Sequence, residues 1–157
     1  MLILLEDARH VPPIFHPFGA IPEAELVEWL QQNGIALPND LLVLWQLTGG
    51  GDVFESETIL RPTVSSIPNT SFVKDDIEGC NARHSAKGKP PEFFIFQHGC
   101  FLSAVRLSDQ KFVTLSEDYA VKGSFDSLND WYVQTLRTEF GERYGLGEIG
   151  GLTLSGS

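Results

Sequence analysis

Two cysteines and two histidines lie close together in the sequence between positions 80 and 100, and they could bind zinc or carry out thiol chemistry. Cys80 precedes His84 with three residues between them, and His98 precedes Cys100 with one. These spacings match no strong zinc motif, and the polar segment between the pairs is unlike a tight metal knuckle. Cys100 could instead be a nucleophile with His98 as its base, but the sequence specifies no acid that would orient the histidine. We therefore predict no catalytic residue, no metal site and no cofactor.

Three consecutive glycines, Gly49–Gly51, raise the question of a phosphate-binding loop. A Walker-type loop follows a strand, precedes a helix and contains a Lys that reaches the phosphates. Here the predicted order is helix, glycines and strand, and the charged residues that follow are Asp52, Glu55 and Glu57. Because carboxylates repel phosphate, we interpret the triplet as a corner. Glycine adopts left-handed backbone angles at little cost, so it ends the helix and turns the chain.

Neighbouring carboxylates such as Asp75–Asp76 and Glu117–Asp118 could indicate a hydrolase. In a chain with 21 Asp and Glu residues, however, adjacent acids are expected by chance, and a solvated loop explains them. No set of residues in the sequence specifies an active site. The sequence therefore favours a binding protein over an enzyme.

Length and charge limit the class of protein further. The 157 residues fit one domain, predicted over residues 1–157, and 11 basic against 21 acidic residues give a net charge of −10. Such a surface repels nucleic acid and anionic membranes. The apolar first residues lack the basic start and the length of a secretory signal, and no apolar run approaches a membrane span. We expect a cytoplasmic protein with two reduced thiols.

The negative charge is concentrated in residues 21–57, which contain no Lys, Arg or His. This segment could be a solvated face that keeps the protein in solution. It could also attract a basic partner and accelerate the encounter with it. Its acids are Glu23, Glu25, Glu28, Asp40, Asp52, Glu55 and Glu57.

Prolines and glycines divide the chain into predicted elements. Pro22 and Pro38 suit the starts of two helices, which Asn33–Gly34 and the glycine triplet end. Alternating apolar residues predict an antiparallel meander and, after it, a closing helix with a buried aromatic stripe. The predicted strands cover 92–96, 100–107, 111–116 and 119–121, and the closing helix covers 125–140.

The remaining segments carry weaker patterns. Residues 1–20 contain three prolines and are expected to be extended or irregular, and 52–73 to form short strands and turns. Residues 74–92 are polar and are expected to be a loop, and 141–157 a glycine-rich tail. Together the elements predict an α+β fold, with a twisted antiparallel sheet and helices packed at one side.

The stretch LPNDLLVLWQLTGGG resembles the signature of the SUKH superfamily of Smi/Knr-like domains, in which a Leu-Pro and an acid begin a helix that ends at a glycine corner. Later segments resemble the family's central strands and closing helix, and the resemblance covers roughly residues 20–137. Thr48 departs from the pattern, as does Arg106-Leu107, and the tail after Gly141 has no counterpart. The matching residues are Leu37, Pro38, Asp40, Leu44, Gly49, Gly50, Phe96, Gly99, Phe125 and Trp131.

The resemblance implies a bacterial immunity protein, which binds and neutralises a cognate toxin, often a nuclease. Other members of the family act as regulators or adaptors, so that alternative stays open. An acidic protein suits a basic polymorphic toxin domain, and we expect a protein partner of that kind. The predicted partner contacts are Asp52, Glu55, Glu57, Asp75, Asp76, Glu78, Glu117 and Asp118.

Overall fold

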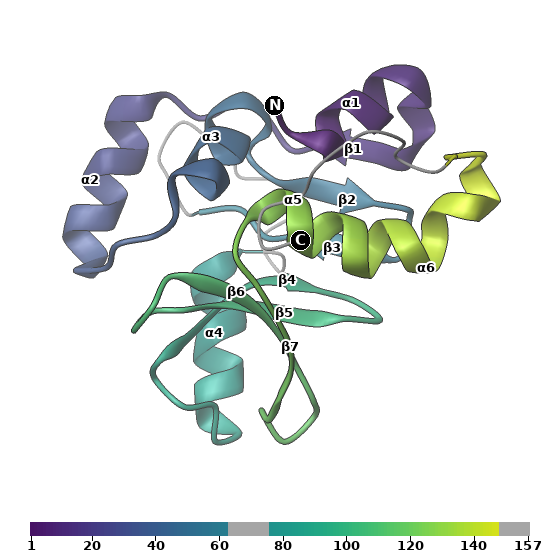
Figure 1. Ribbon diagram of the computed structural model, residues 1–157. Coiled ribbons are helices and arrows are strands. Elements are labelled where there is room, and N and C mark those ends of the chain that lie inside the picture. Colours follow the sequence, from purple (N-terminus) through teal and green to yellow (C-terminus); the bar gives the residue numbers. More distant parts are fainter. Residues whose placement is uncertain (63–75, 148–157) are drawn as a thin grey trace.

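A computed structural model describes residues 1–62 and 76–147 of the chain. Its centre is an open, seven-stranded antiparallel sheet with the strands in sequence order, β1 to β7, and helices pack against it (Figure 1). The predicted α+β class is therefore confirmed. The strands are β1 Phe15–Pro17, β2 Gly51–Val53, β3 Glu57–Ile59, β4 Phe93–His98, β5 Leu102–Arg106, β6 Lys111–Leu115 and β7 Val121–Phe125.

The first residues form a helix, α1 (Ile3–His10), followed by a 3₁₀ turn at Pro12–Ile14. The prediction of an extended or irregular start was wrong for Ile3–His10, because the prolines all follow α1 and do not interrupt it, whereas Phe15–Pro17 is the extended strand β1. The helix is held by its buried Asp7, whose Oδ2 accepts hydrogen bonds from the Tyr132 hydroxyl at 2.7 Å and from Arg137 Nε at 2.8 Å. Burial, together with the hydrogen bond to Asp7, raises the pKa of Tyr132.

Helices α2 (Glu23–Asn33) and α3 (Asn39–Thr48) lie where the sequence predicts them. They pack against each other through the rings of Trp29 and Trp45, which meet edge to face with centroids 5.7 Å apart. The C-cap of α2 is Gly34, with φ of 62°. Helix α2 therefore ends at the glycine that the sequence indicates.

The glycine triplet is the predicted corner. Gly49 caps α3 with φ of 74°, Gly50 follows with φ of 83°, and β2 begins at Gly51. A Cβ on Gly49 would collide with the carbonyl oxygen of Gly19, so backbone packing as well as the left-handed conformation requires glycine here.

Helix α4 (Ile77–Ala86) lies within the segment predicted to be a polar loop, and that prediction was wrong. The Asp76 carboxylate caps its first turn by accepting from the backbone N–H groups of Glu78 and Gly79. Only Ile77 and Cys80 are buried, so the apolar face is too narrow to stand out among polar neighbours in the sequence.

The closing helical segment begins at α5 (Leu128–Tyr132), capped by the Ser127 side chain. It continues through a π-helical turn (Val133–Arg137), α6 (Thr138–Phe140) and a 3₁₀ turn (Gly141–Tyr144). It begins later than the predicted position 125, because β7 continues to Phe125.

The core is aromatic and links the closing segment to the sheet. Trp131 packs on Phe96 with ring centroids 4.8 Å apart, and Phe96 packs on Phe112 at 5.5 Å.

No helix within the described residues is both long and apolar enough to cross a membrane.

Candidate functional site

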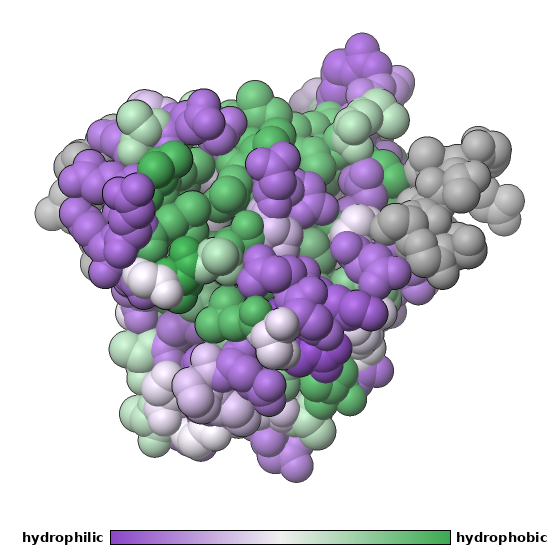
Figure 2. Space-filling model, turned by 60° about the vertical axis from the view of Figure 1, so that its left-hand side comes forward, coloured by the Kyte–Doolittle hydropathy of each residue, from purple (hydrophilic) through white to green (hydrophobic). Residues whose placement is uncertain are grey.

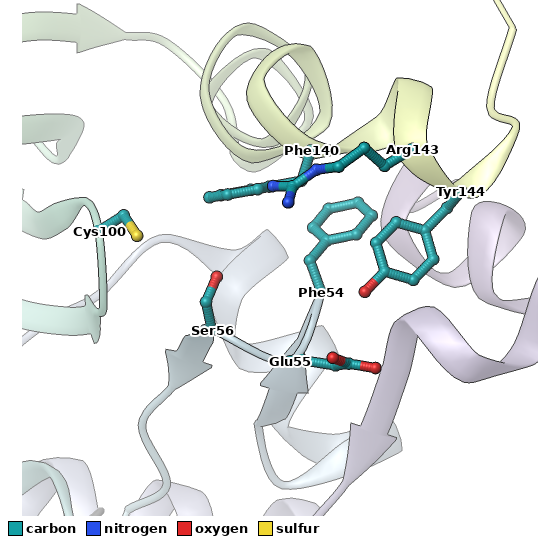
Figure 3. A pocket seen from close by; sticks show the side chains of 7 residues that line it. All are labelled: Phe54, Glu55, Ser56, Cys100, Phe140, Arg143 and Tyr144. Atoms are coloured by element: carbon teal, nitrogen blue, oxygen red, sulfur yellow. The ribbon is translucent and has the colours of Figure 1, made fainter.

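Three separate parts of the chain enclose an open pocket of about 380 Å³ (Figure 3). The turn between β2 and β3 forms one wall, the bend after β4 forms another, and the end of α6 with the following 3₁₀ turn forms the third. The lining residues are Phe54, Glu55, Ser56, Cys100, Phe140, Arg143 and Tyr144.

The β2–β3 turn has an unusual backbone. Phe54 and Glu55 both have left-handed backbone angles, with φ of 50° and 67°. For residues with a Cβ this conformation costs on the order of 1 kcal/mol each. The ring of Phe54 offsets that cost, because it is buried and lies 5.3 Å from the Tyr144 ring and 5.8 Å from the Phe140 ring, centroid to centroid.

Arg143 completes the aromatic wall. Its guanidinium lies 5.2 Å above the centre of the Phe140 ring, a cation–π arrangement. Within the described residues no hydrogen bond or ion pair occupies the N–H donors of this guanidinium, so they are left for other partners.

The opposite wall depends on a buried carboxylate. Glu57 has no exposed surface, and it accepts four hydrogen bonds. Its Oε1 accepts from Gln97 Nε2 at 3.1 Å and from Phe101 N at 3.0 Å. Its Oε2 accepts from Cys100 N at 2.9 Å and from Ser56 Oγ at 2.8 Å. Glu57 therefore ties the bend after β4 to the β2–β3 turn.

Gly99 allows this close approach. It has φ of 152°, and a Cβ there would lie 2.5 Å from Glu57 Oε2 and 2.6 Å from the carbonyl oxygen of Ser56. No side chain fits in that space. The glycine thus lets the bend close over the carboxylate and places Cys100 at the edge of the pocket.

The polar contacts continue into the core. Gln97 Oε1 accepts from Ser103 Oγ at 2.6 Å, and Ser103 Oγ accepts in turn from Trp131 Nε1 at 2.9 Å. All three side chains are buried. Because each buried polar group has a partner, this network fixes the pocket wall relative to α5.

The predicted partner contacts do not form one patch. Glu55, Glu117 and Asp118 are exposed, but the turn that carries the last two lies at the bottom of Figure 1, whereas β2 and β3 lie in its upper half. The Ser116 hydroxyl donates to Asp118 and lowers the pKa of that carboxyl. Glu57 is enclosed, so the prediction that it touches a partner was wrong.

The other predicted contacts are half-buried or undescribed. Asp52 Oδ1 accepts from Thr58 Oγ1 at 3.0 Å, and Glu78 accepts from the indole N–H of Trp29. Asp76 is the cap of α4. Asp75 lies outside the described residues. These acids are part of the local structure as well as of the surface.

The two cysteines considered for thiol or metal chemistry lie in different environments. Cys80 is buried in α4, while Cys100 is exposed beside the pocket. His84 Nδ1 lies 2.8 Å from the Tyr119 hydroxyl, and burial, with a smaller effect from Lys87, lowers the pKa of His84. Within residues 1–62 and 76–147, no three His, Cys, Asp or Glu side chains are arranged to hold a metal.

Sequence reasoning missed the pocket. Phe54 and Glu55 carry no turn signal, and Arg143 and Tyr144 follow the last predicted helix, in a segment assigned to a tail. Nothing in the sequence indicates that these residues meet, because their contact depends on the packing of α6 against the β2–β3 turn.

The fold is similar to that in the crystal structure of a protein from Pseudomonas syringae pv. tomato. The two share a TM-score of 0.58 and 18% sequence identity over 84% of this chain and 97% of the other. At this identity the likeness shows the fold alone. The chain matches no protein-family model and no curated protein.

Proposed function

We propose that this protein is an immunity protein of the SUKH type, which binds a basic toxin domain in the cytoplasm and blocks it by occlusion. The observation that carries the proposal is the set of exposed acids in residues 21–57, namely Glu23, Glu28 and Glu55. The SUKH-like sequence segments support it, since many proteins of that family have this role.

The fold leaves exposed acids of this segment without cationic partners. Within the described residues, Glu23, Glu28 and Glu55 are exposed and form no ion pair. Ion pairs elsewhere in the described chain join Arg9 to Glu6, Arg106 to Asp109, Lys111 to Asp126 and Arg137 to Asp7. The charges of Glu23 and Glu28 on α2 are therefore available to a basic partner.

The surface near these acids also offers apolar contacts. Val27 on α2 is 45% exposed and Leu47 on α3 is 59% exposed. Figure 2, which turns the side of α2 forward, shows hydrophobic patches between hydrophilic groups. A mixture of this kind is typical of protein interfaces, where charge accelerates association and apolar contacts slow dissociation.

The alternative is a regulatory or adaptor protein with the same fold and no toxin partner. Co-expression with the product of the adjacent gene distinguishes an immunity protein from a regulatory or adaptor protein. A toxin partner predicts a stoichiometric complex and rescue of growth in cells that express the toxin domain.

The charge variant for this experiment is Glu23→Gln combined with Glu28→Gln, and its control is Glu92→Gln combined with Glu139→Gln. All four acids are exposed, and both double variants change the net charge equally. We expect weaker rescue only from the first. A complex with a protein that does not harm cells would favour the adaptor.

A further inference from the structure

The Arg143 guanidinium borders the pocket without a carboxylate partner among the described residues. By contrast, Arg9, Arg106 and Arg137 each form an ion pair with a carboxylate. Arg143 is exposed, and within the described residues its guanidinium has a cation–π contact with the Phe140 ring but no hydrogen bond or ion pair. A charged group with unused donors therefore borders the pocket.

The surroundings of Arg143 suit an anion with an apolar stem. In Figure 3, the guanidinium, the Ser56 hydroxyl and the Cys100 thiol border the same opening, and the Phe54 ring flanks it. In Figure 3 the Glu55 carboxylate points away from the guanidinium, and no ion pair joins Glu55 to Arg143. A planar guanidinium with two adjacent N–H donors matches a carboxylate in a bidentate arrangement.

Hydrogen bonds position one side of the pocket. The buried Glu57 carboxylate accepts from Ser56 Oγ and Cys100 N, while the Arg143 guanidinium lies over the Phe140 ring. Groups that are fixed before binding lose little conformational entropy when a ligand binds.

We propose that this pocket receives an Asp or Glu side chain of the protein partner. Arg143 binds the carboxylate, and the aromatic wall packs against its stem. The inference rests on the proposed function for the identity of the partner, but the chemistry of the pocket can be tested without it. The acidic surface of α2 attracts a basic partner, whereas this pocket selects one that carries an acid at the matching position.

The test uses three small probes that share a phenylpropyl skeleton: 3-phenylpropionate, 3-phenylpropanamide and 3-phenylpropylamine. They are titrated into the full-length protein, and the backbone amides of Ser56, Cys100 and Tyr144 are followed by NMR. We expect 3-phenylpropionate to shift these signals with a Kd at least about threefold lower than that of the amide, and the amine to bind most weakly.

Arg143→Gln should remove the preference for the carboxylate probe, and Arg143→Lys should retain part of it. Lys122→Gln is the control, because it removes an exposed positive charge from β7, outside the pocket lining. Equal binding of the amine and the acid, an unchanged preference in Arg143→Gln, or no shift with any probe would overturn the proposal.

A second arm distinguishes a partner's side chain from a free small carboxylate. If the co-expressed partner forms a complex, Arg143→Gln should raise its Kd at least about threefold, and 3-phenylpropionate should compete with it. A probe that binds but leaves the complex unaffected would refute the partner as the source of the carboxylate. If no partner exists, the proposed function fails, while the probe titration still decides the chemistry of the pocket.

Discussion

The substitution Glu57→Gln tests whether the buried carboxylate holds the pocket wall together. Each oxygen of Glu57 accepts two hydrogen bonds, at distances of 2.8 to 3.1 Å. A glutamine keeps one oxygen, but its NH₂ group faces two donors, which lose their acceptor. A buried donor without an acceptor costs about 1–3 kcal/mol. Part of this cost is offset because the glutamine is neutral, so that folding no longer buries a charge at this position. We expect the free energy of unfolding to fall by about 2 kcal/mol.

Urea denaturation measures this change, and NMR shows where it acts. The amide signals of Cys100 and Phe101 should move, because their hydrogen bonds end on the substituted side chain. Glu55→Gln is the control: it makes the same change two residues away on an exposed side chain, and we expect a change within about 0.5 kcal/mol. If Glu57→Gln also stays within that range, the carboxylate does not organise the wall.

Three further changes have defined outcomes. Asp7→Asn should lower the free energy of unfolding by about 2–3 kcal/mol in urea denaturation, because Arg137 loses its buried counterion; a change no larger than that of an exposed acid would contradict this. Gly49→Ala should cost at least about 2 kcal/mol, since φ is 74° and a Cβ collides with backbone; an unchanged melting temperature would refute it. Stability should fall as the pH drops below about 6.5, because the unfolded state binds a proton at His84 more readily than the folded state. His84→Gln should flatten this slope, and an equal slope would remove His84 as its cause.

Local signals in the sequence were enough for the helices and strands that begin and end at prolines and glycines. Helix α2, helix α3 and the meander follow from such signals, because caps and turns act within a few residues. Helix α4 does not, since its two buried residues, Ile77 and Cys80, give little periodicity. The order of the predicted elements indicates the α+β class, whereas helix α4 is evident only in the structure.

The pocket could not be predicted from the sequence for a different reason. Glu57 reads as one more acid in an acidic segment, yet it is fully enclosed. Its donors Cys100 and Phe101 lie more than forty positions away in the chain. A carboxylate that is buried by backbone N–H groups leaves no pattern near itself in the sequence. In the sequence, Gly99 stands out only among the residues of the family resemblance, although its place beside Glu57 is what the pocket requires.

In the proposed function, the exposed acids Glu23 and Glu28 of α2 draw a basic protein to this surface. The most direct measurement is the association rate with the co-purified partner, by stopped flow, between about 50 and 500 mM NaCl. The account predicts a steep fall with salt for the wild type, and a slower rate and a shallower fall for Glu23→Gln combined with Glu28→Gln. Equal rates at every salt concentration, or an equal effect of the Glu92 and Glu139 control, would contradict it.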